Sequence, residues 1–154
     1  MPVLYLCIIA LIAAVDQALK YLVVIYVRPV GTVTAVPYLL DLVYAENRGV
    51  AFGLFQDARW FFIIVTVAVI VLFGVLLVRY RDRSRMFCIA CSLIVGGGIG
   101  NLIDRIFRGF VIDYLQLSFF PPVCNFADYC ITAGSVVLVI YLLFFYKDKK
   151  ERSL

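Results

Sequence analysis

Long apolar runs alternate with short polar segments along the whole chain. A lipid hydrocarbon core of about 30 Å needs about 20 apolar residues in helical form. Four runs reach or approach that length, at residues 4–27, 60–78, 86–105 and 129–146. Trp60 stands at the end of one run, where membrane interfaces favour aromatic side chains. The pattern predicts one integral-membrane domain, residues 1–154, with four transmembrane helices.

Basic residues are concentrated beside two of these runs. One group lies within residues 79–85, and the other forms the tail from Lys147. Because short cytoplasmic loops are enriched in Lys and Arg, both groups are expected in the cytoplasm. Both termini are then cytoplasmic, and residues 28–59 and 103–128 lie outside. The first run has no basic residue before it and continues past Lys20, so we expect a mature helix and not a cleaved signal peptide.

The first outer segment has the pattern of strands. Residues 32–36 are rich in β-branched side chains and end at a proline. Two further stretches, 40–45 and 50–55, flank a turn that holds Asn47 and Gly49, as in a hairpin. The predicted fold class is therefore an all-α membrane protein with a small extracytoplasmic β-rich segment.

Composition removes several function classes. The chain is 65% hydrophobic and 16% charged, which excludes a soluble domain. It contains no histidine, so a Ser-His-Asp triad and a His-based zinc site are both excluded. The net charge of +4 comes from the two clusters beside apolar runs, and it signals topology and not nucleic-acid binding. Hydrolysis would have to use carboxylates, Lys, Tyr, Cys or Ser.

Five cysteines offer little chemistry of their own. The pair Cys88-x-x-Cys91 has metal or redox spacing, but it lies in an apolar run with no second pair, and such sites need further ligands. No metal and no cofactor are expected. Cys124 and Cys130 are both near the outer side, and whether they form a disulfide stays open.

The first span carries two charged residues that a membrane helix normally avoids. Asp16 and Lys20 are four residues apart, so they lie on one face of the helix and can pair. The spacing suits a structural ion pair within the bundle as well as a functional one.

The third span ends in a glycine-rich, then polar, segment. Gly96 and Gly100 have the spacing that lets another helix approach closely. Asn101, Asp104 and Arg105 follow, and with Arg108 they share one helical face. That face must meet a protein interior, a water-filled cavity or the interface. Asp104 and Arg105 are expected to form a structural pair.

Two more carboxylates, Asp113 and Asp128, bracket an outer loop that contains two prolines. Taken singly, Asp113 reads as a loop charge and Asp128 as the N-cap of the fourth helix. Taken together, they suggest another role, because two close carboxylates cannot both ionise easily and one retains a proton. Such a pair supplies the base and the acid of aspartic-protease chemistry without a metal.

Five short motifs, spread in order over nearly the whole chain, resemble bacterial lipoprotein signal peptidase (signal peptidase II). They are Asp16-Gln17-x-x-Lys20, Asn47-x-Gly49-x-Ala51-Phe52-Gly53, Gly97-Gly98-x-Gly100-Asn101-x-x-Asp104-Arg105, Gly109-x-Val111-x-Asp113 and Asn125-Phe126-Ala127-Asp128. The family's second catalytic motif usually has Phe directly before its Asn, where this chain has Cys124.

The resemblance implies an aspartic endopeptidase of the bacterial cytoplasmic membrane. Such enzymes remove the signal peptide of diacylglyceryl-modified prolipoproteins by cutting just before the lipidated cysteine, and globomycin inhibits them. It implies that Asp113 and Asp128 are catalytic, on the extracytoplasmic side, and that Asn125 helps to position the site. The other family positions, with supporting or substrate-binding roles, would be Asp16, Lys20, Asn47, Gly49, Asn101, Asp104 and Arg105. We expect the enzyme to contact membrane lipid and to function as a monomer.

Two other functions remain as alternatives. A small proton-coupled transporter component could use Asp16, Lys20 and Asp104 as a relay, but the second and fourth spans, residues 60–78 and 129–146, carry no charge. A non-enzymatic membrane scaffold would suit the glycines and the β-prone segment, but it gives no reason for two aspartates around one outer loop.

Overall fold

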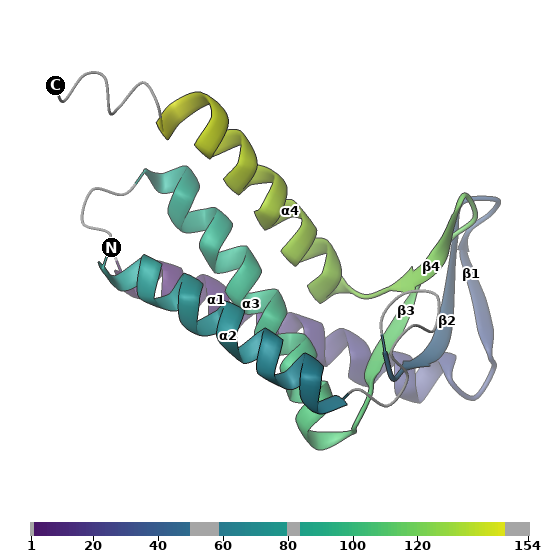
Figure 1. The fold of residues 1–154 in the computed structure, drawn as a ribbon. Helices are drawn as coiled ribbons and strands as arrows, with labels where there is room; N and C mark the ends of the chain where they lie inside the picture. Colours follow the sequence, from purple (N-terminus) through teal and green to yellow (C-terminus); the bar gives the residue numbers. More distant parts are fainter. Residues whose placement is uncertain (1, 50–58, 80–83, 147–154) are drawn as a thin grey trace, which may run out of the picture.

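The computed structural model describes residues 2–49, 59–79 and 84–146. Four long helices extend from one end of the molecule, and a four-stranded sheet stands at the other (Figure 1). All four helices are long and apolar enough to cross a membrane. They are α1 (Pro2–Leu22), continued by the π-helical turn η1 (Val23–Val27), α2 (Arg59–Arg79), α3 (Arg85–Phe107) and α4 (Phe126–Ile140), continued by the π-helical turn η3 (Tyr141–Phe145).

Helix α3 is the centre of the bundle and the most buried of the four spans, whereas α2 is the least buried. The glycines of α3 explain how two other helices approach its backbone closely. A Cβ on Gly96 would lie 2.9 Å from the Cβ of Ile12 in α1, and a Cβ on Gly97 would lie 2.5 Å from the carbonyl oxygen of Ala127 in α4. The small-residue spacing therefore serves close packing, as predicted, and on two faces of α3.

The sheet is larger than the sequence pattern predicted. Its antiparallel strands follow one another in the order β1 (Thr32–Val36), β2 (Leu40–Asn47), β3 (Val111–Leu117) and β4 (Phe120–Cys124). The last two strands come from the loop after α3, where no strand was predicted. Strand β3 pairs with β2, so that Asp113 lies opposite Ala45.

The predicted hairpin around Asn47 and Gly49 is not the one that forms among the described residues. Strand β2 pairs with β1 on one side and with β3 on the other, and the hairpin turn is at residues 37–39, where Tyr38 has a positive φ of 62°. The expected second arm, residues 50–55, lies outside the described residues, as do Ala51, Phe52 and Gly53 of the second motif.

The end of the bundle away from the sheet is where α1 and α3 begin and where α2 and η3 end (Figure 1). Arg79 and Arg85 are at that end, and the predicted basic tail from Lys147 lies outside the described residues, as do Arg81 and Arg83. All five cysteines are free, including Cys124 and Cys130.

Candidate active site

A fully buried lysine organises the polar residues of α1 and α3. The Nζ of Lys20 lies 2.8 Å from Oδ2 of Asp16 and 2.9 Å from Oδ2 of Asp104. It also donates a hydrogen bond of 2.9 Å to Oδ1 of Asn101. Lys20, Asp16 and Asp104 are all completely buried. A buried charge is tolerated when it is paired and hydrogen-bonded, and the three donors of this ammonium group are all used.

Asp104 is a buried anchor and not a solvated helix end. Beyond Lys20, its carboxylate pairs with Arg108 and accepts a hydrogen bond of 3.1 Å from the backbone N–H of Ile112, next to Asp113. The predicted Asp104–Arg105 salt bridge does not form in the described part of the chain. The guanidinium of Arg105 lies over the ring of Phe62, 5.4 Å from its centroid, and its charge interacts with Asp128, Asp113 and Asp104.

Asp128 belongs to the first turn of α4, but it is not the N-cap. Asn125 is the N-cap: its side-chain Oδ1 accepts from the backbone N–H of Asp128 at 2.9 Å. The carboxylate Oδ2 of Asp128 accepts in return from the N–H of Asn125 at 3.2 Å, which completes a capping box. The other oxygen of Asp128 accepts a hydrogen bond of 2.8 Å from the amide of Asn101.

Asp113 faces the start of α4 from β3, and only 3% of it is exposed. Its carboxylate accepts hydrogen bonds from the amide of Asn47 at 2.8 Å and from the amide of Asn125 at 2.6 Å. Burial, and next the charge of Asp128, raise the pKa of Asp113 to about 6, against the lowering effect of both amides and of Lys20.

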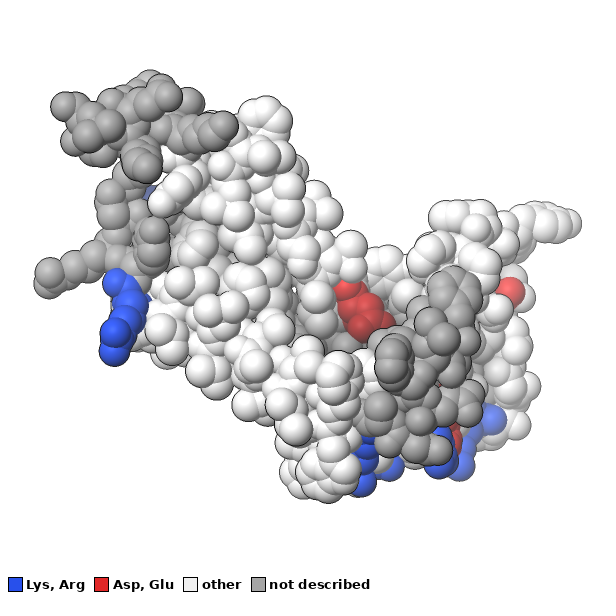
Figure 2. Space-filling model, viewed as in Figure 1, with Lys and Arg blue, Asp and Glu red and all other residues white. Residues whose placement is uncertain are grey.

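Asn125 thus holds both carboxylates at once: its side-chain amide binds Asp113, and its backbone N–H binds Asp128. Among the described residues, the carboxylates of Asp113 and Asp128 accept hydrogen bonds only from uncharged N–H groups, and neither carboxylate forms an ion pair. Acidic atoms are visible at the floor of a hollow between the helices and the sheet (Figure 2). We call Asp113 and Asp128 the dyad.

The remaining residues singled out by sequence lie near this pair. Asn47 ends β2, and its Oδ1 accepts a hydrogen bond of 3.1 Å from the N–H of Gly49, which orients the amide toward Asp113. Asp16 accepts a hydrogen bond of 3.1 Å from the N–H of Ala127, so it binds the first turn of α4. Asn101 connects Lys20 to Asp128.

Two contributors were not identified from sequence. Gln17 donates to the carbonyl oxygen of Gly100 at 3.0 Å and to Asp104 at 3.2 Å, and the hydroxyl of Tyr114 accepts from the N–H of Phe126 at 3.3 Å. The place of Gln17 in the first motif could have indicated its role. Nothing in the sequence indicated the role of Tyr114, because that role depends on the packing of β3 against the start of α4. Within the described ranges no group of three metal-ligating side chains is found.

Two carboxylates in this arrangement can share a proton. One then acts as a base toward a water molecule, and the other donates a proton to the substrate, as in aspartic proteases. The charged groups nearby, Lys20 and Arg105, are held by other partners.

Comparisons with known proteins agree with this chemistry. The family model described as signal peptidase (SPase) II matches residues 8–144. A lipoprotein signal peptidase of Clostridioides difficile is 40% identical over 150 residues, which is 97% of this chain and 99% of the relative. Another, of Caldanaerobacter subterraneus, is 37% identical over 137 residues, covering 89% of this chain and 94% of the relative.

Solved structures support the fold as well. One, titled as a bacterial membrane enzyme structure determined by the in meso method at 2.3 Å resolution, superposes with a TM-score of 0.84 at 26% identity over 90% of this chain and 87% of that one. A second with a similar title, at 1.9 Å, gives a TM-score of 0.83 at 26% identity, covering 92% and 93% of the two chains. The chain therefore belongs to the lipoprotein signal peptidases, the signal peptidase II family of bacterial multi-pass membrane aspartic peptidases that remove signal peptides from prolipoproteins.

Proposed function

We propose that Asp113 and Asp128 are the catalytic residues of this peptidase and that they cut just before a cysteine that carries diacylglycerol. The observation that carries the proposal is the double contact of Asn125, which binds one carboxylate by its side chain and the other by its backbone. A shared ligand of this kind fixes the two carboxylates relative to each other before substrate binds.

In the proposed mechanism Asp113 carries the shared proton in the free enzyme, because its pKa is raised to about 6 beside the charge of Asp128. The ionised Asp128 takes a proton from water, and the water oxygen attacks the scissile carbonyl carbon. Asp113 donates its proton to the carbonyl oxygen. When the C–N bond breaks, the amine of the lipidated cysteine takes the proton held by Asp128. One hydroxyl of the tetrahedral intermediate returns its proton to Asp113 as the C=O bond re-forms, and the signal peptide leaves with a new carboxyl end.

The surrounding residues would position this pair and not react. Asn101 links Asp128 to the buried Lys20. Asp104 binds the chain next to Asp113, and Asp16 binds the chain next to Asp128. Asn47 holds Oδ2 of Asp113. The hollow between the helices and the sheet (Figure 2) would admit the signal helix from the membrane and its cleavage site from the sheet side.

We further propose that the sheet and the dyad face the extracytoplasmic side and that both termini are cytoplasmic. The support is the placement of Arg79 and Arg85 at the end of the bundle away from the sheet, since positive residues favour the cytoplasmic side. All the proposed site residues belong to one chain, so a monomer suffices for activity.

The proposal is tested with purified protein in detergent and a diacylglyceryl-modified prolipoprotein. The product mass locates the cut, and we expect it directly before the lipidated cysteine. Acid–base groups contribute on the order of 10²–10⁴ to rate, so Asp113→Asn and Asp128→Asn should each lose at least about 10²-fold in kcat/KM. Asp41→Asn is the matched control, because it removes a carboxylate from β2 that lies opposite Thr34 and Gln116. Wild-type rates in either dyad variant would show that the assignment is wrong.

A further inference from the structure

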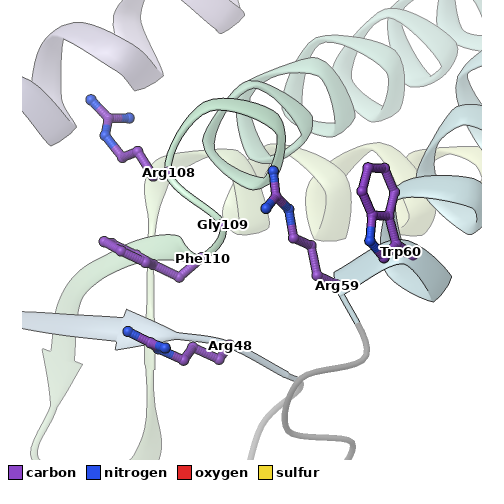
Figure 3. A pocket seen from close by; sticks show the side chains of 6 residues that line it. All are labelled: Arg48, Arg59, Trp60, Arg108, Gly109 and Phe110. Atoms are coloured by element: carbon purple, nitrogen blue, oxygen red, sulfur yellow. The ribbon is translucent and has the colours of Figure 1, made fainter.

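A second pocket, lined by residues outside the dyad, opens where α2 begins and α3 ends. Its volume is about 380 Å³, and Figure 3 shows the described side chains that line it. They are Arg48, Arg59, Trp60, Arg108, Gly109 and Phe110. We call this the arginine pocket.

The described residues that line the pocket carry an excess of positive charge. None of its described lining residues is acidic. Arg108 is neutralised by the buried Asp104, and Arg48 makes an exposed pair with Glu46 at 3.2 Å. Arg59 forms no ion pair with any residue in the described ranges. The charge of the described lining residues therefore favours an anionic ligand.

Arg59 is held in a fixed position without using up its donors. Its Nη2 donates a hydrogen bond of 2.8 Å to the carbonyl oxygen of Ile106, and its guanidinium lies 5.3 Å from the ring centroid of Trp60. The Nε atom is buried and has no hydrogen-bond partner in the described parts of the chain. The side chain extends toward the turn at Gly109 (Figure 3), where Nη1 comes within 3.6 Å of the place of an added Cβ.

The position of the pocket fits the depth of lipid headgroups. It sits directly at the first residue of α2, whose following side chains Trp60, Phe61 and Ile64 are exposed and apolar. Phe107, at the end of α3, is exposed as well. Trp residues mark the interface between hydrocarbon and water, and basic pockets between membrane helices bind anionic headgroups. A phosphate here would have its acyl chains beside the apolar face of α2.

We propose that the arginine pocket binds the phosphate headgroup of an anionic phospholipid in the leaflet on the sheet side. The proposed ligand differs chemically from the lipid of the substrate, because a diacylglyceryl group contains no phosphate. The proposal does not rest on the catalytic assignment: lipid binding can be measured on the protein alone.

The test is native mass spectrometry of the detergent-purified protein with equimolar phosphatidylglycerol and phosphatidylcholine. Both lipids carry a phosphate, but the choline cation of phosphatidylcholine offsets its charge, and losing an interaction with a charged group corresponds to at least about a tenfold change in binding. We therefore expect the wild type to retain phosphatidylglycerol about tenfold over phosphatidylcholine, and we expect Arg59→Gln to lose that preference. Arg28→Gln is the matched control, since Arg28 is exposed and lies over the ring of Tyr44, outside the pocket. Arg48→Gln, a second pocket variant, should reduce the preference independently.

Three results would overturn the proposal. One is equal retention of both lipids by the wild type. Another is an equal loss in Arg28→Gln and Arg59→Gln, which would indicate general attraction to a basic surface. The third is displacement of phosphatidylglycerol by millimolar inorganic phosphate, which would identify a site for a free anion. Melting temperatures of all variants, measured beside the binding, separate lost selectivity from lost folding, and Arg48→Gln decides the result if Arg59→Gln does not fold.

Discussion

The two groups of buried carboxylates in this protein differ in what neutralises them. Asp16 and Asp104 each contact the ammonium group of Lys20 within 3 Å, at 2.8 and 2.9 Å. Asp113 and Asp128 are bound by asparagine side chains and a backbone N–H, with no cation on either carboxylate among the described residues. The first group has its charge balanced in place, which suits a structural role. The second keeps its affinity for a proton, which suits acid–base chemistry.

Which carboxylates receive the cation depends on where the residues lie in the helices as well as on residue type. Lys20 stands one turn after Asp16 and reaches Asp104 across the α1–α3 contact, where Gly100 allows close approach: a Cβ there would lie 2.6 Å from Oδ2 of Asp16. Asn101 lies between the two groups and touches both. The ion-paired cluster therefore provides a rigid base from which the dyad is positioned.

The largest expected effect is on the ion-paired cluster. Lys20→Met removes the cation and leaves two buried carboxylates without it, and breaking a buried pair in this way costs about 3–5 kcal/mol. Thermal unfolding in detergent should show a large loss of stability. Arg79→Met, at the exposed end of α2, is the control and should change stability little. A Lys20→Met protein with the same melting temperature as the wild type would show that the cluster does not stabilise the bundle.

A smaller effect is expected where the two carboxylates meet. Asn125→Asp keeps an oxygen that can cap α4, but it turns the donor facing Asp113 into an acceptor. Losing a hydrogen bond to a charged group corresponds to about 10- to 100-fold, so kcat/KM should fall by at least that factor.

Aspartate can still cap α4, but it adds a buried carboxylate that faces Asp113. The melting temperature of Asn125→Asp should therefore fall, but less than that of Lys20→Met. Equal losses of activity and stability would assign Asn125 to folding and not to the dyad.

The smallest effect is a displaced pH profile. Because Asp113 has a pKa of about 6 and is proposed to carry the shared proton, kcat/KM should fall as pH rises through that value. The hydrogen bond from Asn47 lowers the pKa of Asp113, so Asn47→Ala should raise it and move the alkaline limb to higher pH, by on the order of one unit. A limb that moves to lower pH in Asn47→Ala contradicts the assignment of the proton.

Much of this architecture could be predicted from sequence because its signals are local. Apolar runs of membrane-spanning length predict the helices, and the four-residue spacing of Asp16 and Lys20 predicts their pairing, which the structure contains. The glycines of α3 likewise indicate close packing. The dyad was suggested by two carboxylates around one outer loop, and its catalytic role was implied by resemblance to a family, since no local pattern joins β3 to α4.

The features that were missed depend on long-range pairing. Strand β3 pairs with β2, which lies far away in sequence, and β4 then pairs with β3 as the second arm of a hairpin. Asp128, taken singly, was expected to be the N-cap of the fourth helix, but Asn125 takes that position and Asp128 completes the capping box from the first turn of α4. Asp104 and Arg105 are adjacent in sequence, but successive helix positions point in different directions, so Asp104 meets Lys20 while Arg105 meets Phe62.

The most direct test of this account measures melting temperature and kcat/KM together for Asp104→Asn and Asp128→Asn. The account predicts opposite patterns. Asp104→Asn should lose several degrees or more of stability while its folded fraction still cleaves the prolipoprotein, and Asp128→Asn should fold like the wild type but lose at least about 10²-fold in kcat/KM. A stable but inactive Asp104→Asn, or an active Asp128→Asn, would contradict the division between paired structural carboxylates and an unpaired catalytic dyad.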